Sequence, residues 1–391
     1  MHLNDLLKKV TERGASDLHV KVGSHPVIRV NGQLIPLTEE KRMMQEDTIS
    51  MAFSIMSARQ KQKFKDHFEL DMAHSVPGLG RFRCNVFQQR GTVGMVVRVI
   101  PVRIATVQEL NLPPVLDQIA QERRGLVLVT GTTGSGKSTT LSALIDYINA
   151  NRTEHIMTIE DPIEFLHRDK KSLVNQREVE VDTKNFAYAL RSALRQDPDV
   201  ILVGEMRDYE TIETALTAAE TGHLVLSTLH TLDATETINR VISVFPPHQQ
   251  KQIRIQLASV LKAVISMRLV ARQDGQGRAP AVEVMRATPF IRDCIENKEK
   301  TKLIATAIAA GTSQYGMQTF DQSIYNLYRN GMISFEEALR QASNPDEFKL
   351  KVGGIQSTSD LSQEAMEATL TDSQELDPHD PESPFEFSAT S

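Results

Sequence analysis

The stretch Gly131-Thr-Thr-Gly-Ser-Gly-Lys137-Ser138-Thr139 decides the fold of this chain. It directly follows the apolar run of residues 126–129 and precedes a helical pattern. The spacing G-x-x-x-x-G-K-[ST] lets backbone N–H groups wrap a polyphosphate, places a lysine on the β and γ oxygens and offers a hydroxyl to Mg²⁺. The helix that starts there turns its positive end toward the same phosphates. We therefore predict a nucleoside triphosphate site, with Ser138 as metal ligand, formed by Gly131, Thr132, Thr133, Gly134, Ser135, Gly136, Lys137, Ser138 and Thr139.

The length and composition of the chain favour a multidomain protein of the cytoplasm. Its 391 residues exceed what one hydrophobic core usually organises, so we expect two or three domains. No stretch is apolar enough to span a membrane, and the polar start Met1-His-Leu-Asn-Asp does not resemble a signal peptide. The two cysteines, Cys84 and Cys294, lack a C-x-x-C neighbour and indicate neither a disulfide scaffold nor a zinc site.

The net charge of −6 comes from the end of the chain. Residues 355–391 hold nine acidic side chains and no Lys or Arg. This segment is also rich in Ser, Thr and Pro and has little apolar periodicity, so burial cannot offset the entropy of ordering it. We predict a disordered acidic tail, and an interaction role around Phe385-Glu-Phe387 is the alternative.

Residues 1–100 are predicted to form a small domain of their own. Apolar residues recur at helical spacing from Leu3 to Val10, which indicates an amphipathic helix. Alternating and hairpin-like patterns predict strands at residues 17–22, 26–30, 33–37, 69–75, 81–88 and 92–99. Further helices are expected before residue 65, so the domain should be a sheet with helices on one side. Residues 101–114, which end in Leu-Pro-Pro, are the predicted linker.

Residues 115–275 repeat the pattern of strand followed by helix, and residues 276–354 are predicted to form a helical region after them. Short, almost continuously apolar runs predict strands at residues 126–130, 155–160, 199–203 and 224–229. Such runs are typical of a buried parallel sheet. Ligands bind at the carboxyl ends of the strands in a sheet of this kind, so the residues that follow these runs are the candidates for chemistry.

Carboxylates follow two of the predicted strands. Glu160, Asp161 and Glu164 come at the end of the second run, and three carboxylates in five residues suit Mg²⁺ or its waters. A capping role for Asp161 would explain one of the three. Glu205 follows the third run after Gly204, in a place where many ATPases have Asp and then Glu. Glu205 is therefore the candidate that orients the attacking water, and a place next to a helix cap is the alternative.

Two histidines flank the fourth run. His230 comes at its carboxyl end, where an imidazole can contact a γ-phosphate or relay its loss. A packed or capping histidine is equally compatible with that position. His223 precedes the same run and is the weaker candidate.

Taken together, these motifs resemble the secretion ATPase superfamily, specifically the PilT retraction ATPases of type IV pili. The resemblance extends from about Leu3 to about Phe348. The stretches that correspond to the Walker A, Asp box, Walker B and His box motifs are residues 131–139, Ile159-Glu-Asp-Pro-Ile-Glu-Phe165, Gly204-Glu205-Met-Arg207-Asp208, and Thr221-Gly-His223 through His230-Thr.

The resemblance implies an α/β fold with a small PAS-like N-terminal domain and a RecA-like P-loop ATPase domain. It implies a homohexamer that hydrolyses ATP with Mg²⁺, in which Glu205 is the catalytic glutamate and Glu160 or Glu164 assists at the metal and the water. Ring assembly would also let an arginine of one subunit reach the γ-phosphate bound by the next. Arg81 and Arg98 are the candidates for this role, and ordinary salt bridging is the alternative.

The implied partner is the inner-membrane platform protein of the pilus machine. The chain would then work in the cytoplasm, at the cytoplasmic face of the inner membrane, without inserting into it. A paralogous retraction ATPase is a further candidate partner. Nucleic acid is not expected, because the nucleotide domain shows no basic stripe with interleaved aromatic residues, and the chain has no Trp and only six Tyr.

One stretch departs from the family pattern. Retraction ATPases usually carry a signature close to A-I-R-N-L-I-R-E, and the matching stretch here is Phe290-Ile-Arg292-Asp-Cys-Ile-Glu-Asn297. Only Ile291, Arg292 and Ile295 agree with it. An accessory role like that of PilU therefore stays open beside the retraction motor. An assembly ATPase is less favoured, because those proteins typically add a larger N-terminal region and a four-cysteine zinc site.

Overall fold

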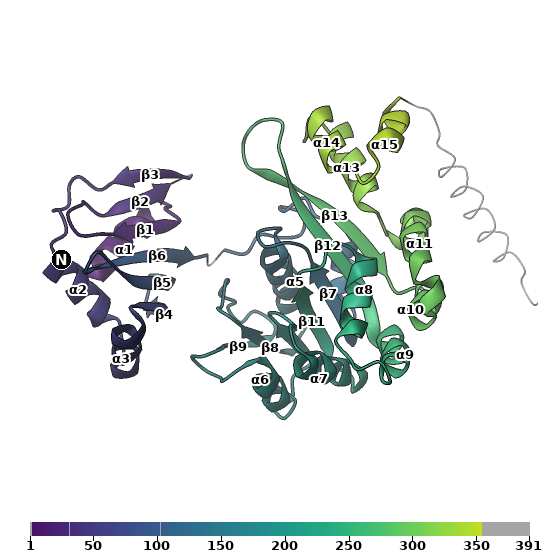
Figure 1. The fold of residues 1–391 in the computed structure, drawn as a ribbon, viewed down its shortest axis with the longest axis horizontal. Coiled ribbons are helices and arrows are strands. Elements are labelled where there is room, and N and C mark those ends of the chain that lie inside the picture. Colours follow the sequence, from purple (N-terminus) through teal and green to yellow (C-terminus); the bar gives the residue numbers. More distant parts are fainter. Residues whose placement is uncertain (1, 31, 102, 354–391) are drawn as a thin grey trace, which may run out of the picture. The chain divides into compact units, whose positions relative to one another are not determined.

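The computed structural model describes residues 2–30, 32–101 and 103–353, which form two compact units (Figure 1). Of the described residues, the first unit comprises those up to Ile104 together with the segments Glu160–Asp169 and Gln176–Asp182. The second unit comprises the segments Ala105–Ile159 and Lys170–Asn175 and residues 183–353. The tail predicted at residues 355–391 lies outside the described residues. Among the described helices, none is long and apolar enough to cross a bilayer.

The first unit contains an antiparallel sheet with the strand order β3-β2-β1-β6-β5-β4. Its strands are β1 (Asp17–Val20), β2 (Val27–Val30), β3 (Gln33–Pro36), β4 (Glu69–Val76), β5 (Gly80–Gln89) and β6 (Thr92–Ile100). Its helices are α1 (Leu3–Glu12), α2 (Gln45–Ser54) and α3 (Ala58–His67). All six predicted strands are present, and β1 ends at Val20 rather than at residue 22.

One face of this sheet is apolar and the other carries arginines. The apolar face packs on α1, whose four apolar positions are all buried: Leu3, Leu6, Leu7 and Val10. Because side chains alternate along a strand, Phe82 and Cys84 of β5 point into this core while Arg81 and Arg83 point to the other face. Arg98 of β6 lies opposite Arg83 on that polar face.

A buried ion pair ties the later segments to the first unit. Arg81 Nη2 donates to Glu178 Oε2 at 2.8 Å, and the Ile163 amide donates to the same oxygen at 3.2 Å. Glu178 is 3% exposed, so its carboxylate is stabilised by the charge of Arg81 and by these two hydrogen bonds rather than by water. A second pair joins Lys63 to Glu180 at 3.0 Å, and both of its side chains are largely exposed.

The second unit contains a seven-stranded sheet with the order β13-β12-β7-β11-β10-β8-β9. Its strands are β7 (Gly125–Thr130), β8 (His155–Glu160), β9 (Leu173–Glu178), β10 (Val200–Val203), β11 (Leu224–Leu229), β12 (Leu261–Ala271) and β13 (Arg278–Arg286). The pairs from β12 through β7, β11 and β10 to β8 are all parallel, whereas β12 and β13 are antiparallel. The four strands predicted from apolar runs therefore form the centre of the sheet.

Helices cover both faces of this sheet. Those in the first part of the unit are α4 (Val115–Ala120), α5 (Lys137–Asn151), α6 (Phe186–Ala193), α7 (Tyr209–Glu220), α8 (Ala234–Ser243) and α9 (Gln250–Val260). Val127 and Val129 of β7 pack with α4 and α5 in one core cluster. Leu126 and Leu128 point to the opposite face and are buried as well, so both faces are shielded from water, as the confirmed α/β class requires.

The region predicted to be helical from residue 276 begins instead with a strand. Residues 278–286 form β13, the antiparallel partner of β12 at the edge of the sheet. The helices follow it: α10 (Pro289–Glu296), the 3-10 helix η1 (Lys298–Leu303), α11 (Ile304–Ala310), α12 (Thr312–Tyr315), α13 (Phe320–Arg329), α14 (Phe335–Gln341) and α15 (Pro345–Val352). α13 packs on β13 through Ile324 and Phe320 in a core cluster of its own.

Breaking the Arg81–Glu178 pair is expected to loosen the segments Glu160–Asp169 and Gln176–Asp182. Glu178→Ala leaves the Arg81 guanidinium without its partner in a largely buried place, at a cost of about 3 kcal/mol. Local opening of the two segments should become easier by a similar amount, so that hydrogen–deuterium exchange of their amides accelerates by about two orders of magnitude. Mass spectrometry of peptides from the full chain measures this exchange.

The matched control is Glu180→Ala. This change removes an exposed pair, which is worth less than about 1 kcal/mol, and should leave the exchange of both segments nearly unchanged. Equal exchange in the Glu178→Ala and Glu180→Ala variants would show that the buried pair does not hold these segments.

Candidate active site

The predicted phosphate-binding loop, residues 131–136, connects the buried strand β7 to α5. Three of its glycines have a positive φ: +137° at Gly131, +78° at Gly134 and +99° at Gly136. A Cβ atom on Gly131 would lie 2.4 Å from the Met267 carbonyl oxygen of β12, whereas one on Gly134 would meet no atom within 4 Å. Gly131 is therefore required by close backbone approach and by its conformation together.

The side chains of the loop provide donors for an anion. Lys137 is the first residue of α5, and its Nζ donates to the carbonyl oxygens of Gly131 at 2.7 Å and Thr132 at 3.0 Å. Ser135 Oγ is buried and has no hydrogen-bond partner among the described residues. An orphaned hydroxyl beside a lysine at a helix start fits a phosphate oxygen as the missing partner.

The loop also fits a magnesium–nucleotide complex. Ser138 is half-buried in the first turn of α5, directly after Lys137. Within the described part of the chain, no three His, Cys, Asp or Glu side chains gather in a way that could hold a metal by themselves. Mg²⁺ usually keeps waters and phosphate oxygens as ligands and needs few from the protein, so one hydroxyl is compatible with such a site.

Glu205 and His230 meet at the same edge of the sheet. Glu205 follows β10 and His230 follows β11, and these two strands are parallel neighbours. Because β11 also pairs with β7, its carboxyl end lies beside the phosphate-binding loop. His230 Nε2 is 3.2 Å from Glu205 Oε1, and Arg207 Nε is 2.6 Å from the same oxygen. The Thr228 hydroxyl donates to the Gly204 carbonyl at 2.6 Å and joins the two strand ends.

The electrostatic surroundings keep Glu205 ionised. Burial by itself would raise its pKa, but the hydrogen bond and charge of Arg207, together with His230, lower the pKa below its ordinary value. A carboxylate that stays ionised at neutral pH and lies at the carboxyl edge of the sheet can accept a hydrogen bond from an attacking water. Its two contacts also fix the orientation of the carboxylate.

Neighbouring residues of the Walker B and His box motifs have structural roles. Asp208 caps α7, because its side chain accepts from the Thr211 amide at 2.9 Å, so Glu205 is not the capping residue. His223 lies at the amino end of β11, and its Nδ1 is 2.9 Å from the Ala218 carbonyl oxygen. His223 is thus at the edge of the sheet opposite to His230, in keeping with its weaker candidacy.

The carboxylates of the Asp box belong to the first unit. Glu160 is the last residue of β8, and its Oε1 accepts from Gln176 Nε2 at 3.1 Å. Gln176 also donates to the Phe165 carbonyl at 2.9 Å, so one amide side chain braces this loop. Glu164 is exposed on the same loop.

The two candidate arginines are ion-paired within the first unit. Arg81 is largely buried against Glu178, whereas Arg98 Nε donates to Asp17 Oδ1 at 2.9 Å and keeps a side chain that is 68% exposed. Sequence reasoning missed the Arg81–Glu178 pair, because the two residues are 97 positions apart and only a fold brings them together. It also gave Arg207 no role at Glu205, although a spacing of two residues was a usable signal.

Comparisons with known proteins show the family to which this chain belongs. A family model described as "Type II/IV secretion system protein" matches residues 1–340. The type IV pilus retraction ATPase PilT of Pseudomonas aeruginosa is 47% identical over 352 residues, which cover 89% of this chain and 100% of PilT. The type IV pilus ATPase PilU of the same organism is 42% identical, over 90% of this chain and 91% of PilU.

Solved structures show the same relationship. The crystal structure described as the pilus retraction motor PilT with bound ADP superimposes with a TM-score of 0.81 at 46% identity, over 89% of this chain and 98% of that one. The ATPase DotB of Legionella pneumophila follows with a TM-score of 0.74 at 27% identity, over 90% of this chain and 96% of DotB. The chain therefore belongs to the type II/IV secretion system protein family, among the ATPases related to PilT.

Proposed function

We propose that this chain is the ATP-hydrolysing motor that drives retraction of a type IV pilus. The observation that carries the proposal is the Glu205 carboxylate, which Arg207 and His230 hold at the sheet edge next to the phosphate-binding loop. The similarity to PilT over its whole length supports the assignment to retraction rather than to assembly.

In this proposal Glu205 orients a water molecule for in-line attack on the γ-phosphate of ATP. Lys137 and the loop amides bind the β and γ oxygens, and Ser138 would hold Mg²⁺, which neutralises charge on the same phosphates. His230 keeps Glu205 in place and lies where it can sense the γ-phosphate. Glu160 or Glu164 of the Asp box assists at the metal and the water.

The proposed assembly is a homohexameric ring in which an arginine acts on the nucleotide of the adjacent subunit. Arg98 is the better candidate, because its side chain is 68% exposed and its partner Asp17, which is buried, would keep Arg29 at 3.9 Å and the Ser16 hydroxyl at 2.8 Å. Arg81 could act only after leaving Glu178, which is buried. The ring would work at the cytoplasmic face of the inner membrane on the platform protein of the pilus machine, alone or with a paralogous retraction ATPase.

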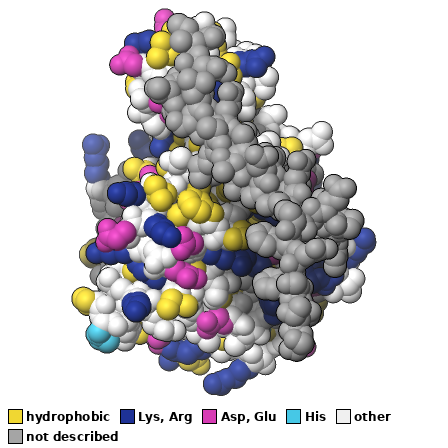
Figure 2. All heavy atoms as spheres, turned by 90° about the vertical axis from the view of Figure 1, so that its right-hand side faces the viewer, with side chains coloured by type: hydrophobic (Ala, Val, Ile, Leu, Met, Phe, Trp, Pro, Cys, Tyr) yellow, Lys and Arg dark blue, Asp and Glu magenta, His cyan; other side chains and the backbone are white. Residues whose placement is uncertain are grey.

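A second candidate function, an accessory role like that of PilU, is favoured by the divergence of residues 290–297. This stretch coincides with α10, in which Ile291 and Ile295 are buried and Arg292 is exposed. Two of the three positions that agree with the retraction signature are thus explained by packing alone. A nucleic-acid translocase is less favoured, because the sequence of the nucleotide domain has no basic stripe with interleaved aromatic residues. On the face drawn in Figure 2, basic side chains lie among acidic ones.

The proposed function is tested by the pili of cells that carry Glu205→Gln as their only copy of this chain. Gln keeps the size of the side chain but loses the charge that activates water, so retraction should stop while assembly continues. We expect excess surface pili by electron microscopy and loss of twitching motility. Bald cells would mean that the chain drives assembly, and an unchanged pilus count would fit an accessory role or a different machine.

Gly131 and Gly134 of the loop provide a matched pair of variants that tests nucleotide binding. Gly131→Ala should weaken ATP binding at least about tenfold, because its Cβ atom collides with the backbone of β12 and forces the loop to move. Gly134 also has a positive φ, but a Cβ atom there meets no other atom, so Gly134→Ala should weaken ATP binding much less. Isothermal titration with a non-hydrolysable ATP analogue measures both, and equal losses would contradict the role of close approach at Gly131.

A further inference from the structure

Glu283 is a buried carboxylate in the middle of β13 that the proposed mechanism does not use. It is 7% exposed and lies opposite Ser266 of β12 in the edge hairpin of the seven-stranded sheet. A charged side chain is costly in such a place unless hydrogen bonds stabilise it. Two donors approach it, and each comes from an element that leads to the nucleotide site.

The first donor is the start of α8. The Ala234 amide donates to Glu283 Oε1 at 2.9 Å in a buried hydrogen bond. Ala234 is the first residue of α8, and only residues 231–233 separate it from His230. Thr231 and Thr237 share a buried hydrogen bond of 2.6 Å that ties this short connection to α8. Fixing Ala234 therefore restricts where His230 can place its ring.

The second donor leads to the phosphate-binding loop. Ser266 lies directly opposite Glu283 in the β12–β13 pair, and its hydroxyl lowers the pKa of Glu283. The Thr130 hydroxyl donates in turn to Ser266 Oγ at 3.0 Å. Thr130 and Ser266 are completely buried, and Thr130 is the last residue of β7, directly before Gly131. A row of buried polar groups thus runs from the loop through Thr130, Ser266 and Glu283 to the start of α8.

We propose that Glu283 is a positioning residue of the nucleotide site, which couples the phosphate-binding loop to His230 by accepting hydrogen bonds from Ser266 and Ala234 at the same time. The coupling rests on the proposed ATP hydrolysis, because His230 acts through its contact with Glu205. Glu283 itself touches neither the nucleotide loop nor Glu205, and it acts only through its neighbours.

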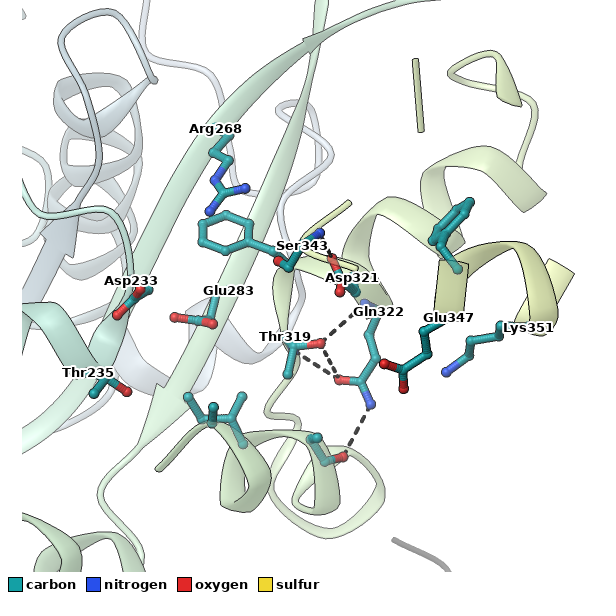
Figure 3. Close-up of a pocket in the computed structure, with 15 residues that line it drawn as sticks. Asp233, Thr235, Arg268, Glu283, Thr319, Asp321, Gln322, Ser343, Glu347 and Lys351 are labelled. Carbon is teal, nitrogen blue, oxygen red and sulfur yellow. Dashed lines mark hydrogen bonds between the residues drawn. The ribbon is translucent and has the colours of Figure 1, made fainter. Parts of the chain in front are cut away.

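The surroundings of Glu283 place its titration near neutral pH. Burial raises its pKa to about 7 against the lowering effect of the Ala234 amide; Asp233 raises the pKa further, whereas Arg268 and the Ser266 hydroxyl lower it. Figure 3 shows Glu283 and Asp233 pointing into one cavity of about 340 Å³. The other charged side chains that face this cavity from β12, α13 and α15 are Arg268, Asp321, Glu347 and Lys351.

Protonation changes what Glu283 can accept. The ionised carboxylate has two acceptor oxygens, one for Ala234 and one for Ser266. The protonated acid turns one oxygen into a donor, and both partners present donors, so one of the two contacts must break or rearrange. The coupled arrangement is therefore complete only when Glu283 is ionised, and its population rises with pH through about 7.

The test is the pH dependence of ATP hydrolysis by the purified full chain. For the wild-type chain the ionised fraction of Glu283 should rise from about one-tenth at pH 6 to about nine-tenths at pH 8, and kcat should follow it. In the isosteric variant Glu283→Gln this rise should disappear, and the pH dependence that remains belongs to the other titrating groups. KM for ATP should change less than about twofold, because the loop still binds phosphate.

Two further variants separate coupling from simple packing. Ser266→Ala removes a donor that lowers the pKa of Glu283, so the inflection of kcat should move to higher pH. Ser323→Ala is the matched control: Ser323 Oγ accepts from the Val282 amide at 3.0 Å, next to Glu283 on β13 but outside this row of polar groups. Its pH profile should be that of the wild type.

Thermal unfolding reports the titration independently of activity. Folding raises the pKa of Glu283, so the folded chain binds this proton more tightly than the unfolded chain does. The contribution of Glu283 to the free energy of unfolding therefore falls as pH rises toward and through about 7. Glu283→Gln lacks this loss, so its melting temperature relative to the wild type should increase between pH 5 and pH 8.

A wild-type chain that hydrolyses ATP with the same pH profile as Glu283→Gln would overturn the positioning role and leave the proposed function intact. A constant difference in melting temperature would likewise overturn the titration of Glu283. Absence of hydrolysis by the wild-type chain would instead count against the proposed function.

Discussion

The structure depends on the parallel pairing of β7, β11 and β10. Parallel strands end at the same edge of a sheet, so the segments that follow them, far apart in sequence, are brought together without any long-range side-chain contact. The phosphate-binding loop, His230 and Glu205 follow these three strands in their spatial order. The candidate site in the second unit depends on this edge, because a strand that slipped in register would move its candidate side chain away from the other two.

Polar contacts and burial then set the protonation of the side chains that the strands position. Arg207 and His230 overcome the effect of burial on Glu205 and keep it ionised, as a residue that orients water requires. Glu283 lies in the opposite electrostatic situation, because burial dominates there and moves its titration into the neutral range. Two glutamates of one unit thus have different protonation behaviour, set by the number and charge of their neighbours.

The sequence was most informative where local patterns decide structure. Central strands of a parallel sheet are continuous apolar runs, and β8 and β11 were predicted at their observed bounds. β12 and β13 were missed, because β12 follows α9 without an intervening turn and β13 carries Glu283 and Pro280 inside its apolar run. The candidate site was located from its motifs, but the contacts of Arg81 with Glu178 and of Glu283 with Ala234 join residues 97 and 49 positions apart, and no local pattern encodes them.

The proposed function requires that the edge formed by Lys137, Glu205 and His230 hydrolyses ATP. ATP turnover and ATP binding of the purified wild-type and Glu205→Gln chains test this requirement. We expect turnover to fall by about 100-fold or more in Glu205→Gln while the Kd for ATP stays within about threefold. Turnover near the wild-type level, or a loss of binding as large as the loss of turnover, would show that Glu205 does not orient the attacking water.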